Sequence, residues 1–171
     1  MALIAMFTVT AQAQIVHSQS SRITRTKGAH TPSIFADLGI GAFTGDAESA
    51  GIDLGLRWSK MFNPNVGWDI LKVSAQTSFK DFDKALDLQA KTGIRGVTPV
   101  VFGNSTLYGN FAAGVGYFVD PDELGFAWEV GAGVNLSQRC ALGVVYNNNN
   151  YSKRGYNFKI GLVSLRFSYG F

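Results

Sequence analysis

Cysteine and charge are both scarce in this sequence, and each shortage excludes a class of protein. The single cysteine, Cys140, excludes an internal disulfide and any cysteine-rich metal site. Charged residues make up 16% of the chain, whereas soluble domains typically contain about 25%. No apolar run approaches the ~20 residues of a membrane-spanning helix, and no helical periodicity is present. What remains is a chain of 171 residues, 46% hydrophobic, whose apolar residues are dispersed.

Basic charge is also too sparse to indicate nucleic-acid binding. The net charge is +3, and the one basic cluster, Arg22, Arg25 and Lys27, contains no aromatic residue. The short acidic clusters near residues 81 and 120 lack the regular ligand spacing of a calcium loop. We therefore expect no nucleic acid and no metal as ligands, and no motif in the sequence indicates a cofactor.

The residues that are present alternate between apolar and polar over eight segments. The sixth segment is the most regular, because Trp128, Val130, Ala132 and Val134 alternate with Glu129, Gly131 and Gly133. A period of two residues is the pattern of a β-strand with two unlike faces. Strands are predicted over approximately residues 33–42, 50–58, 71–79, 86–95, 107–117, 126–136, 140–146 and 157–171.

Two of these segments are irregular. At the start of the third, Asp69 falls among the apolar positions, whereas Trp68 and Ile70 fall among the polar ones. In the eighth, the apolar residues up to Leu162 hold one register and those from Val163 onward hold the other. A β-bulge near Leu162 would reconcile the two registers, and we predict one there.

Stretches rich in Gly, Pro, Asn and Asp separate the strands. Turns are predicted at Asn63–Asn65, Pro99–Ser105 and Ser137–Arg139, which share one end of the sheet. Loops are predicted at the other end, at Phe43–Ser49, Lys80–Lys84, Val119–Glu123 and Asn147–Tyr156. The last of these, NNNNYSKRGY, is the only one of a size to recognise a partner.

The polar face of the predicted sheet carries nearly all of its charge. Its charged residues are Asp37, Asp53, Arg57, Lys72, Asp87, Lys91, Arg95, Glu129 and Arg166. A soluble barrel or sandwich would expose this face to water, and a membrane-spanning barrel would enclose it. The same face is rich in glycine, which suits the crowded interior of a narrow barrel.

Two further features favour the membrane-spanning arrangement. Apolar stretches of about 9–11 residues recur, which is the span of a tilted strand through a bilayer. Large aromatic residues lie near the ends of the apolar faces, as in an aromatic girdle: Trp58, Phe79, Tyr117 and Phe126. We predict an all-β fold, an eight-stranded antiparallel up-and-down transmembrane β-barrel over residues 31–171. Its lumen would hold the nine charged residues as a network, with a narrow ion path as the less favoured interpretation.

The N-terminus has the features of an export signal. Residues Ala2–Ala11 form an apolar run, and Ala11-Gln12-Ala13 is a small-x-small cleavage site. We expect residues 1–13 to be a signal peptide cleaved after Ala13, although the usual basic residues before the apolar run are missing. Residues 14–30 are then a flexible periplasmic segment.

The last ten residues, LVSLRFSYGF, form an alternating strand that ends on phenylalanine. Its apolar positions are Val163, Leu165, Phe167, Tyr169 and Phe171. This strand resembles the C-terminal signal that the insertion machinery of Gram-negative outer membranes reads. Together with TGIRGVTPV, LYGNFAAGVGY and FAWEVGAGVNLS, it makes residues 31–171 similar to small outer-membrane barrels of the OmpA-transmembrane-domain and OmpX kind, and to the outer membrane protein beta-barrel domain families.

This resemblance implies a location, a set of partners and a role. The chain would lie in the outer membrane, in contact with lipid and lipopolysaccharide, and an even strand number would place both termini in the periplasm. Both histidines, His17 and His30, precede the barrel, so the His–Ser pair expected of a lipid-hydrolysing barrel is absent. We expect a non-enzymatic protein with a structural or partner-docking role. A larger outer-membrane complex is one partner to which it could dock. The alternatives are a small porin-like pore and a soluble secreted ligand-binding barrel.

Overall fold

The computed structural model describes residues 33–45, 49–80, 86–102, 105–120, 122–153 and 156–171, and its regular secondary structure there is all β-strand. The strands are β1 (Ile34–Gly45), β2 (Ala50–Met61), β3 (Val66–Ser78), β4 (Asp87–Phe102), β5 (Ser105–Phe118), β6 (Glu123–Asn135), β7 (Cys140–Lys153) and β8 (Tyr156–Gly170). The predicted signal peptide, residues 1–13, and the segment 14–30 lie outside the described residues.

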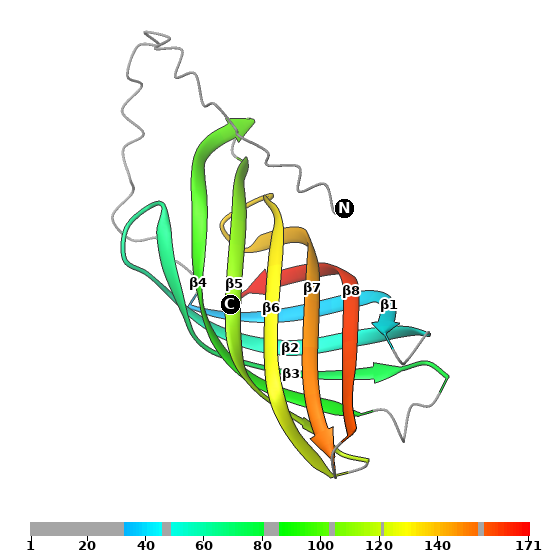
Figure 1. The fold of residues 1–171 in the computed structure, drawn as a ribbon. Helices are drawn as coiled ribbons and strands as arrows, with labels where there is room; N and C mark the ends of the chain where they lie inside the picture. Colours follow the sequence, from blue (N-terminus) through cyan, green and yellow to red (C-terminus); the bar gives the residue numbers. More distant parts are fainter. Residues whose placement is uncertain (1–32, 46–48, 81–85, 103–104, 121, 154–155) are drawn as a thin grey trace, which may run out of the picture. The chain divides into compact units, whose positions relative to one another are not determined.

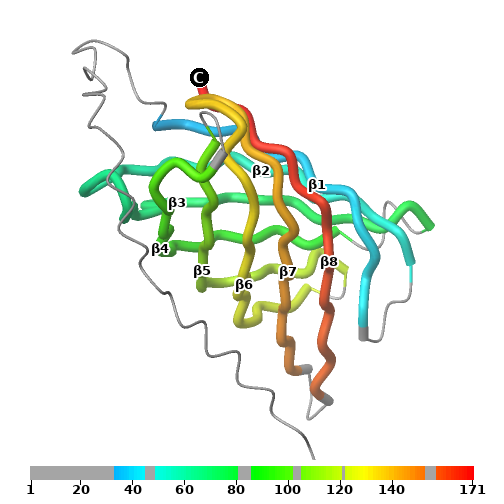
Figure 2. Tube along the Cα trace, turned by 90° about the horizontal axis from the view of Figure 1, so that it is seen from above, coloured from blue at the N-terminus to red at the C-terminus, as the bar shows by residue number. Residues whose placement is uncertain are grey.

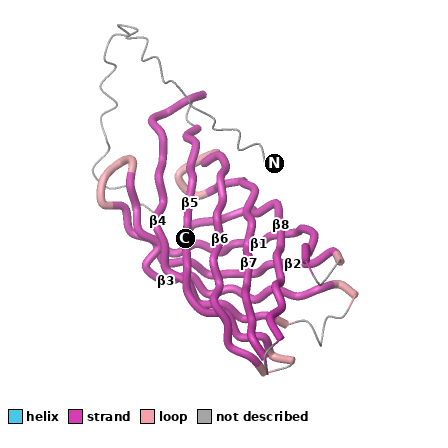
Figure 3. Tube along the Cα trace, in the orientation of Figure 1, coloured by secondary structure: helices cyan, strands magenta, loops and turns pink. Residues whose placement is uncertain are grey.

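The eight strands form one closed antiparallel barrel (Figure 1). Each strand pairs with the next in sequence, and β1 pairs with β8 from Phe35–Gly170 to Gly45–Ile160. Figure 2 shows β1 and β8 running side by side where the sheet closes, and Figure 3 shows that strands make up almost all of the described chain. The predicted eight-stranded up-and-down barrel fold is confirmed. We call the end where β1 begins and β8 ends the terminal end, and the opposite end the far end.

Side chains alternate between an apolar outer surface and a polar lumen. Glu129 is 1% exposed, whereas the next residue, Val130, is 45% exposed. Most of the large exposed hydrophobic residues occupy such outward positions, and charged residues make up half of the largest fully buried side chains. A soluble protein has the opposite distribution, with its apolar residues inside. The geometry therefore does not fit a soluble barrel that buries its apolar face.

The predicted loop Asn147–Tyr156 is wrong, because β7 continues through the asparagine run to Lys153 and β8 begins at Tyr156. The side chains of Asn147 and Asn149 are fully buried in the lumen. Asparagine is uncommon in strands, and the composition therefore indicated a loop. Hydrogen bonds inside the barrel override that local preference, and the chain has no long recognition loop at this position.

The predicted β-bulge near Leu162 is also wrong. The registers of β8 with β1 and with β7 are continuous through this residue. Ile160 and Leu162 point into the lumen, in phase with Ser164 and Arg166. The sequence suggested a change of phase because these two inward residues are apolar. Phe43, assigned to a loop, belongs to β1 and also points inward.

A bulge does occur in β3, where the sequence showed its other irregularity. Ile70 and Leu71 stand opposite the single residue Thr92 of β4, since Asp69 pairs with Gly93 and Lys72 with Lys91. The extra residue reverses the phase of the strand, so Asp69 faces the lumen although an unbroken alternation would place it outside.

The predicted turn Pro99–Ser105 is shorter than expected. β4 runs on to Phe102 and β5 begins at Ser105, so that the two strands continue past β3, whose last pair with β4 joins Val66 to Gly96. Figure 1 shows β4 extending beyond its neighbours at this end. The predicted turns Asn63–Asn65 and Ser137–Arg139 do separate β2 from β3 and β6 from β7.

Candidate functional site: the filled lumen

The strand alternation directs nine predicted charged residues, together with Asp69, into the lumen. The acids are Asp37, Asp53, Asp69, Asp87 and Glu129, and the bases are Arg57, Lys72, Lys91, Arg95 and Arg166. Five negative and five positive formal charges give a lumen of zero net charge. The irregular phase of the third strand was the signal that could have identified Asp69, because an unbroken strand would expose this acid on the apolar surface.

Glu129 of β6 is the centre of this network. Lys72 Nζ lies 2.6 Å from both carboxylate oxygens, and Lys91 Nζ lies 2.9 Å from Oε2. Arg166 Nη1 lies 3.2 Å from Oε1, and the Asn110 amide donates to the same oxygen at 3.0 Å. Four strands besides β6 thus converge on one carboxylate. Its charge is opposed by three cations, which offsets the large cost of burying it.

A second group of ion pairs lies nearer the terminal end. The Arg57 guanidinium lies 3.3 Å from Asp37 and 3.3 Å from Asp69, and the Ser59 hydroxyl donates to Asp69 at 2.5 Å. Arg95 is at the margin of this group, with its Nε 4.0 Å from Asp69 and its guanidinium 4.5 Å from the ring centre of Tyr108. Lys72, 3.9 Å from Asp37, connects the group to Glu129.

Asp87 is held differently, by neutral donors. Tyr151 donates to it at 2.6 Å, Gln89 donates at 3.0 Å, and Asn149 also donates to it. Because Asp87 belongs to β4 and Asn149 and Tyr151 belong to β7, these bonds form a bridge across the lumen. Among the described residues, no lysine or arginine is within salt-bridge distance of Asp87.

The bridge passes over two strands that have almost no side chains on the inside. β5 and β6 contribute glycine or alanine at the inward positions beneath it, namely Gly114, Gly116, Gly125 and Ala127. A Cβ atom added to Gly116 would lie 2.7 Å from the Tyr151 hydroxyl, and one added to Gly125 would lie 2.5 Å from its ring. The inward glycines therefore make room for a tyrosine laid across the lumen.

An apolar cluster closes the far end of the lumen. We call it the apolar cap, and it consists of Phe43, Phe118, Tyr151, Phe158, Ile160 and Leu162. Its rings pack closely, since the centroids of Tyr151 and Phe158 are 5.2 Å apart and those of Phe118 and Tyr151 are 5.7 Å apart. The lumen thus passes from ion pairs through polar amides to apolar packing.

The predicted girdle residues all lie on the outer surface. Trp58 is at the terminal end, whereas Phe79, Tyr117 and Phe126 are towards the far end. The structure adds two aromatic residues that were not predicted, Phe62 and Trp68 at the terminal end, stacked with their centroids 6.4 Å apart. The residues of the proposed insertion signal also face outward: Val163, Leu165, Phe167, Tyr169 and Phe171.

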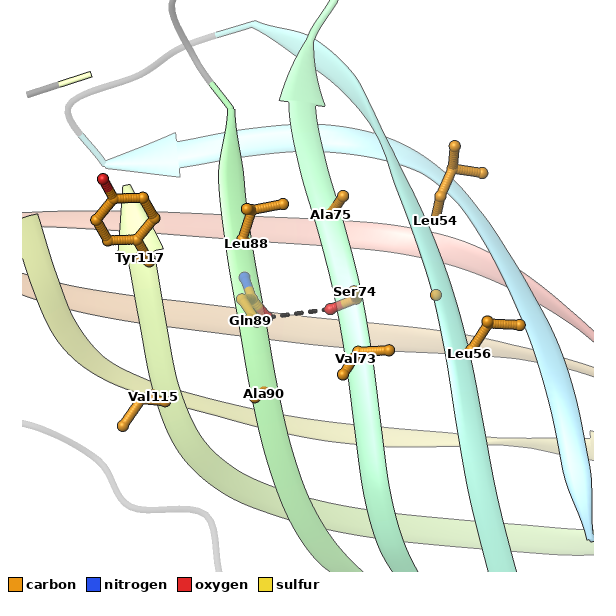
Figure 4. A pocket seen from close by; sticks show the side chains of 11 residues that line it. Leu54, Leu56, Val73, Ser74, Ala75, Leu88, Gln89, Ala90, Val115 and Tyr117 are labelled. Carbon is orange, nitrogen blue, oxygen red and sulfur yellow. Dashed lines mark hydrogen bonds between the residues drawn. The ribbon is translucent and has the colours of Figure 1, made fainter. Parts of the chain in front are cut away.

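A shallow groove of about 600 Å³ lies on the outer surface of β2 to β5. It forms because Ala75 and Ala90 are small, between Leu54 and Leu56 on one side and Val115 and Tyr117 on the other (Figure 4). Its lining contains no carboxylate, histidine, lysine or thiol. Most of the lining is aliphatic, so the groove offers mainly apolar contact.

No helix within the described ranges is long and apolar enough to cross a membrane. Within those ranges, no group of three or more His, Cys, Asp or Glu residues could hold a metal ion.

The fold has counterparts among solved structures. No protein-family model matches the chain, and no curated protein matches its sequence. The crystal structure of the outer membrane enzyme PagL is similar, with a TM-score of 0.55 and 17% identity over 80% of this chain and 99% of that one. The crystal structure of Neisserial surface protein A has a TM-score of 0.54 and 12% identity over 81% of this chain and 96% of that one. The chain therefore has the fold of small outer-membrane β-barrels.

Proposed function

We propose that this chain, which has the fold of small outer-membrane barrels, is a non-enzymatic barrel with a structural or partner-docking role in the bacterial outer membrane. The observation that carries the proposal is the inverted distribution of side chains, with charge inside and aliphatic residues outside. In hydrocarbon only helices and closed barrels satisfy every backbone group, and this barrel is closed. Its outer surface would contact lipid tails and the acyl chains of lipopolysaccharide.

The filled lumen favours a structural role over a pore. An eight-stranded barrel has an interior just wide enough for side chains to fill. Here the Glu129 network occupies the middle of the lumen, and the apolar cap occupies the far end. A continuous aqueous path would require both groups to move. We therefore place the porin-like alternative second.

The lack of a histidine in the barrel supports a non-enzymatic role. PagL is an outer membrane enzyme, but a similarity at 17% identity shows the fold alone and carries no chemistry over to this chain. The two histidines of this chain are residues 17 and 30, before β1. The outer groove contains no base beside a hydroxyl nucleophile, which hydrolysis of a lipid ester would need.

The β4–β5 hairpin supports a docking role. The segment from Gly96 to Leu107 contains no charged residue. Val100 and Val101 are 53% and 43% exposed in the part of β4 that lies beyond its pairing with β3. An uncharged apolar strand edge is an uncommon feature of a surface that faces water, and it suits contact with another protein. We propose that both termini and this hairpin are on the periplasmic side.

The test uses the protein purified from membranes in detergent. We expect heat-modifiable migration on gels, no hydrolysis of lipid, and no stable conductance steps in planar bilayers. Purification without detergent would contradict the membrane assignment, and steady conductance would favour the porin-like alternative.

Docking at the hairpin is tested separately by cross-linking in native membranes. Val101→Glu should remove a cross-linked partner, whereas Leu124→Glu at the far end should retain it. Retention of the partner by both variants would contradict docking at the hairpin.

A further inference from the structure

Several buried polar atoms in the lumen have no hydrogen-bond partner among the residues that the structure describes. Five of them belong to the region between the Glu129 network and the apolar cap: Asp53 Oδ1, Gln76 Nε2, Asn147 Nδ2, Asn149 Oδ1 and Ser164 Oγ. Their residues are at most 1% exposed. An unpaired buried polar group costs about 1–3 kcal/mol, so five in one region would be a large penalty for a small barrel.

These atoms lie around one region of the lumen. Asp53 and Gln76 are opposite each other in the pairing of β2 and β3. A Cβ atom added to Gly39 would lie 3.2 Å from Asp53 Cβ and 3.2 Å from Ser164 Oγ, so these two side chains come together over the glycine of β1. Gln76 also stands opposite Asp87, which receives a hydrogen bond from Asn149 across the lumen. Asn147 is the next inward residue of β7. We call this region the polar chamber.

The polar chamber is closed at both ends. Towards the far end, the next inward residues after Ser164 and Asn149 are Leu162 and Tyr151, which belong to the apolar cap. Towards the terminal end, Arg166 binds both Asp53 and Glu129. Leu162, Tyr151 and Arg166 are themselves buried, so bulk water does not touch the chamber from either end.

The chemistry of the chamber selects its occupant. Gln76 Nε2 and Asn147 Nδ2 are donors, Asp53 Oδ1 and Asn149 Oδ1 are acceptors, and the Ser164 hydroxyl is both. A bound cation would need acceptors alone, and an anion would need donors alone. Water donates and accepts, and a buried water typically makes about three hydrogen bonds to such groups.

We propose that the polar chamber is a binding site for ordered water molecules, which bridge Asp53, Gln76, Asn147, Asn149 and Ser164 beneath the apolar cap. The cap then has a definite role: it separates these waters from the solvent at the far end. The inference is independent of the proposed function, since it concerns the lumen alone and would hold for a barrel with any external partner.

The experiment is nuclear magnetic resonance of the folded barrel in detergent micelles. Cross-relaxation with water would be measured at the side-chain amide protons of Gln76 and Asn147, with the Asn110 amide, which donates to Glu129 at 3.0 Å, as the internal control. We expect cross-peaks of the sign that marks long-lived water at Gln76 and Asn147, and none at Asn110. The Ser164 hydroxyl proton exchanges with water and could pass the signal to a nearby amide without any bound water. The Ser164→Ala variant lacks this proton, and we expect the cross-peaks to persist in that variant. Absence of water cross-peaks at both amides in the unmodified protein would overturn the proposal.

A cap variant tests the closure. Truncating the buried side chain in Leu162→Ala lowers the cost of opening the cap, so we expect water exchange from the chamber to be faster by about tenfold or more. Leu165→Ala, which truncates an outward leucine three residues further along the same strand, should leave the exchange unchanged. Heat-modifiable migration establishes that each variant is folded. Equal exchange in the Leu162 and Leu165 variants would overturn the role of the cap.

Discussion

Tyr151 crosses the lumen only because the strands beneath it have no side chains at that point. A Cβ atom at Gly116 would lie 2.7 Å from the tyrosine hydroxyl, and no other side-chain atom would come closer to it than 3.5 Å. Tyr151 is 2% exposed and bonded to Asp87, so it cannot move aside freely. Glycine is used here for space rather than for an unusual backbone conformation.

Replacing Gly116 with alanine is therefore expected to destabilise the barrel by about 1–3 kcal/mol through overpacking. Tyr151→Phe removes the oxygen in closest contact, so the double variant should lose less stability than the two single variants added together. Gly109→Ala is the matched control, because its Cβ would face outward with its nearest neighbour 3.8 Å away. Denaturant titration in micelles measures all four proteins. A purely additive double variant would contradict the clash.

At the scale of the strand, the bulge in β3 decides which way its first residues face. Thr92, opposite the bulge, receives a hydrogen bond from Trp68 Nε1 at 2.9 Å and donates one to the Asp69 carbonyl at 3.0 Å. The extra residue interrupts the hydrogen-bond ladder between β3 and β4 beside Asp69. The Thr92 hydroxyl then serves as a partner for the Asp69 carbonyl. This contact holds Asp69 inside and Trp68 outside.

The isosteric change Thr92→Val removes both hydrogen bonds on a surface that faces away from the lumen. We expect a loss of about 1–3 kcal/mol of unfolding free energy, because the carbonyl and the indole N–H lose their partner in an apolar setting. Thr44→Val, at an exposed position of β1, should change stability by less than about 0.5 kcal/mol. The comparison is made by denaturant titration, and equal stability of the two variants would show that the hydroxyl does not hold the bulge.

At the scale of the whole molecule, the lumen is electrically balanced. Nine of its ten charged residues form one chain of ion pairs that reaches from Arg95 to Lys91, and Glu129 is its most connected member. Gln89 links the tenth, Asp87, to Lys91. Removing a charge from this chain of ion pairs leaves the lumen with an unbalanced charge where water does not reach freely.

Glu129→Ala is expected to cost about 3–5 kcal/mol, since it leaves Lys72, Lys91 and Arg166 without their shared partner. Asp122→Asn is the control: this carboxylate is exposed and bonded only to the Tyr117 hydroxyl among the contacts in the structure, so its loss should cost about 0.5 kcal/mol or less. Folded yield and denaturant titration in micelles provide the readout. A stable Glu129→Ala barrel would show that the network does not hold the lumen together.

The sequence by itself determined the number of strands, their antiparallel order and the face that each residue presents wherever the alternation was unbroken. These properties are local. The period of two determines the direction of each side chain, and a short turn makes each strand pair with the next strand in the sequence. Tertiary structure alone decided the three exceptions. Asparagines became strand because their amides bind Lys91 and Asp87 across the lumen. Apolar Ile160 and Leu162 turned inward because they complete the cap, and Asp69 turned inward because a bulge brings it to Arg57. Lys91 and Asp87 lie 56 and 62 residues from their asparagine partners, and Arg57 lies 12 residues from Asp69 on the neighbouring strand. The alternation within a single strand contains none of these partners.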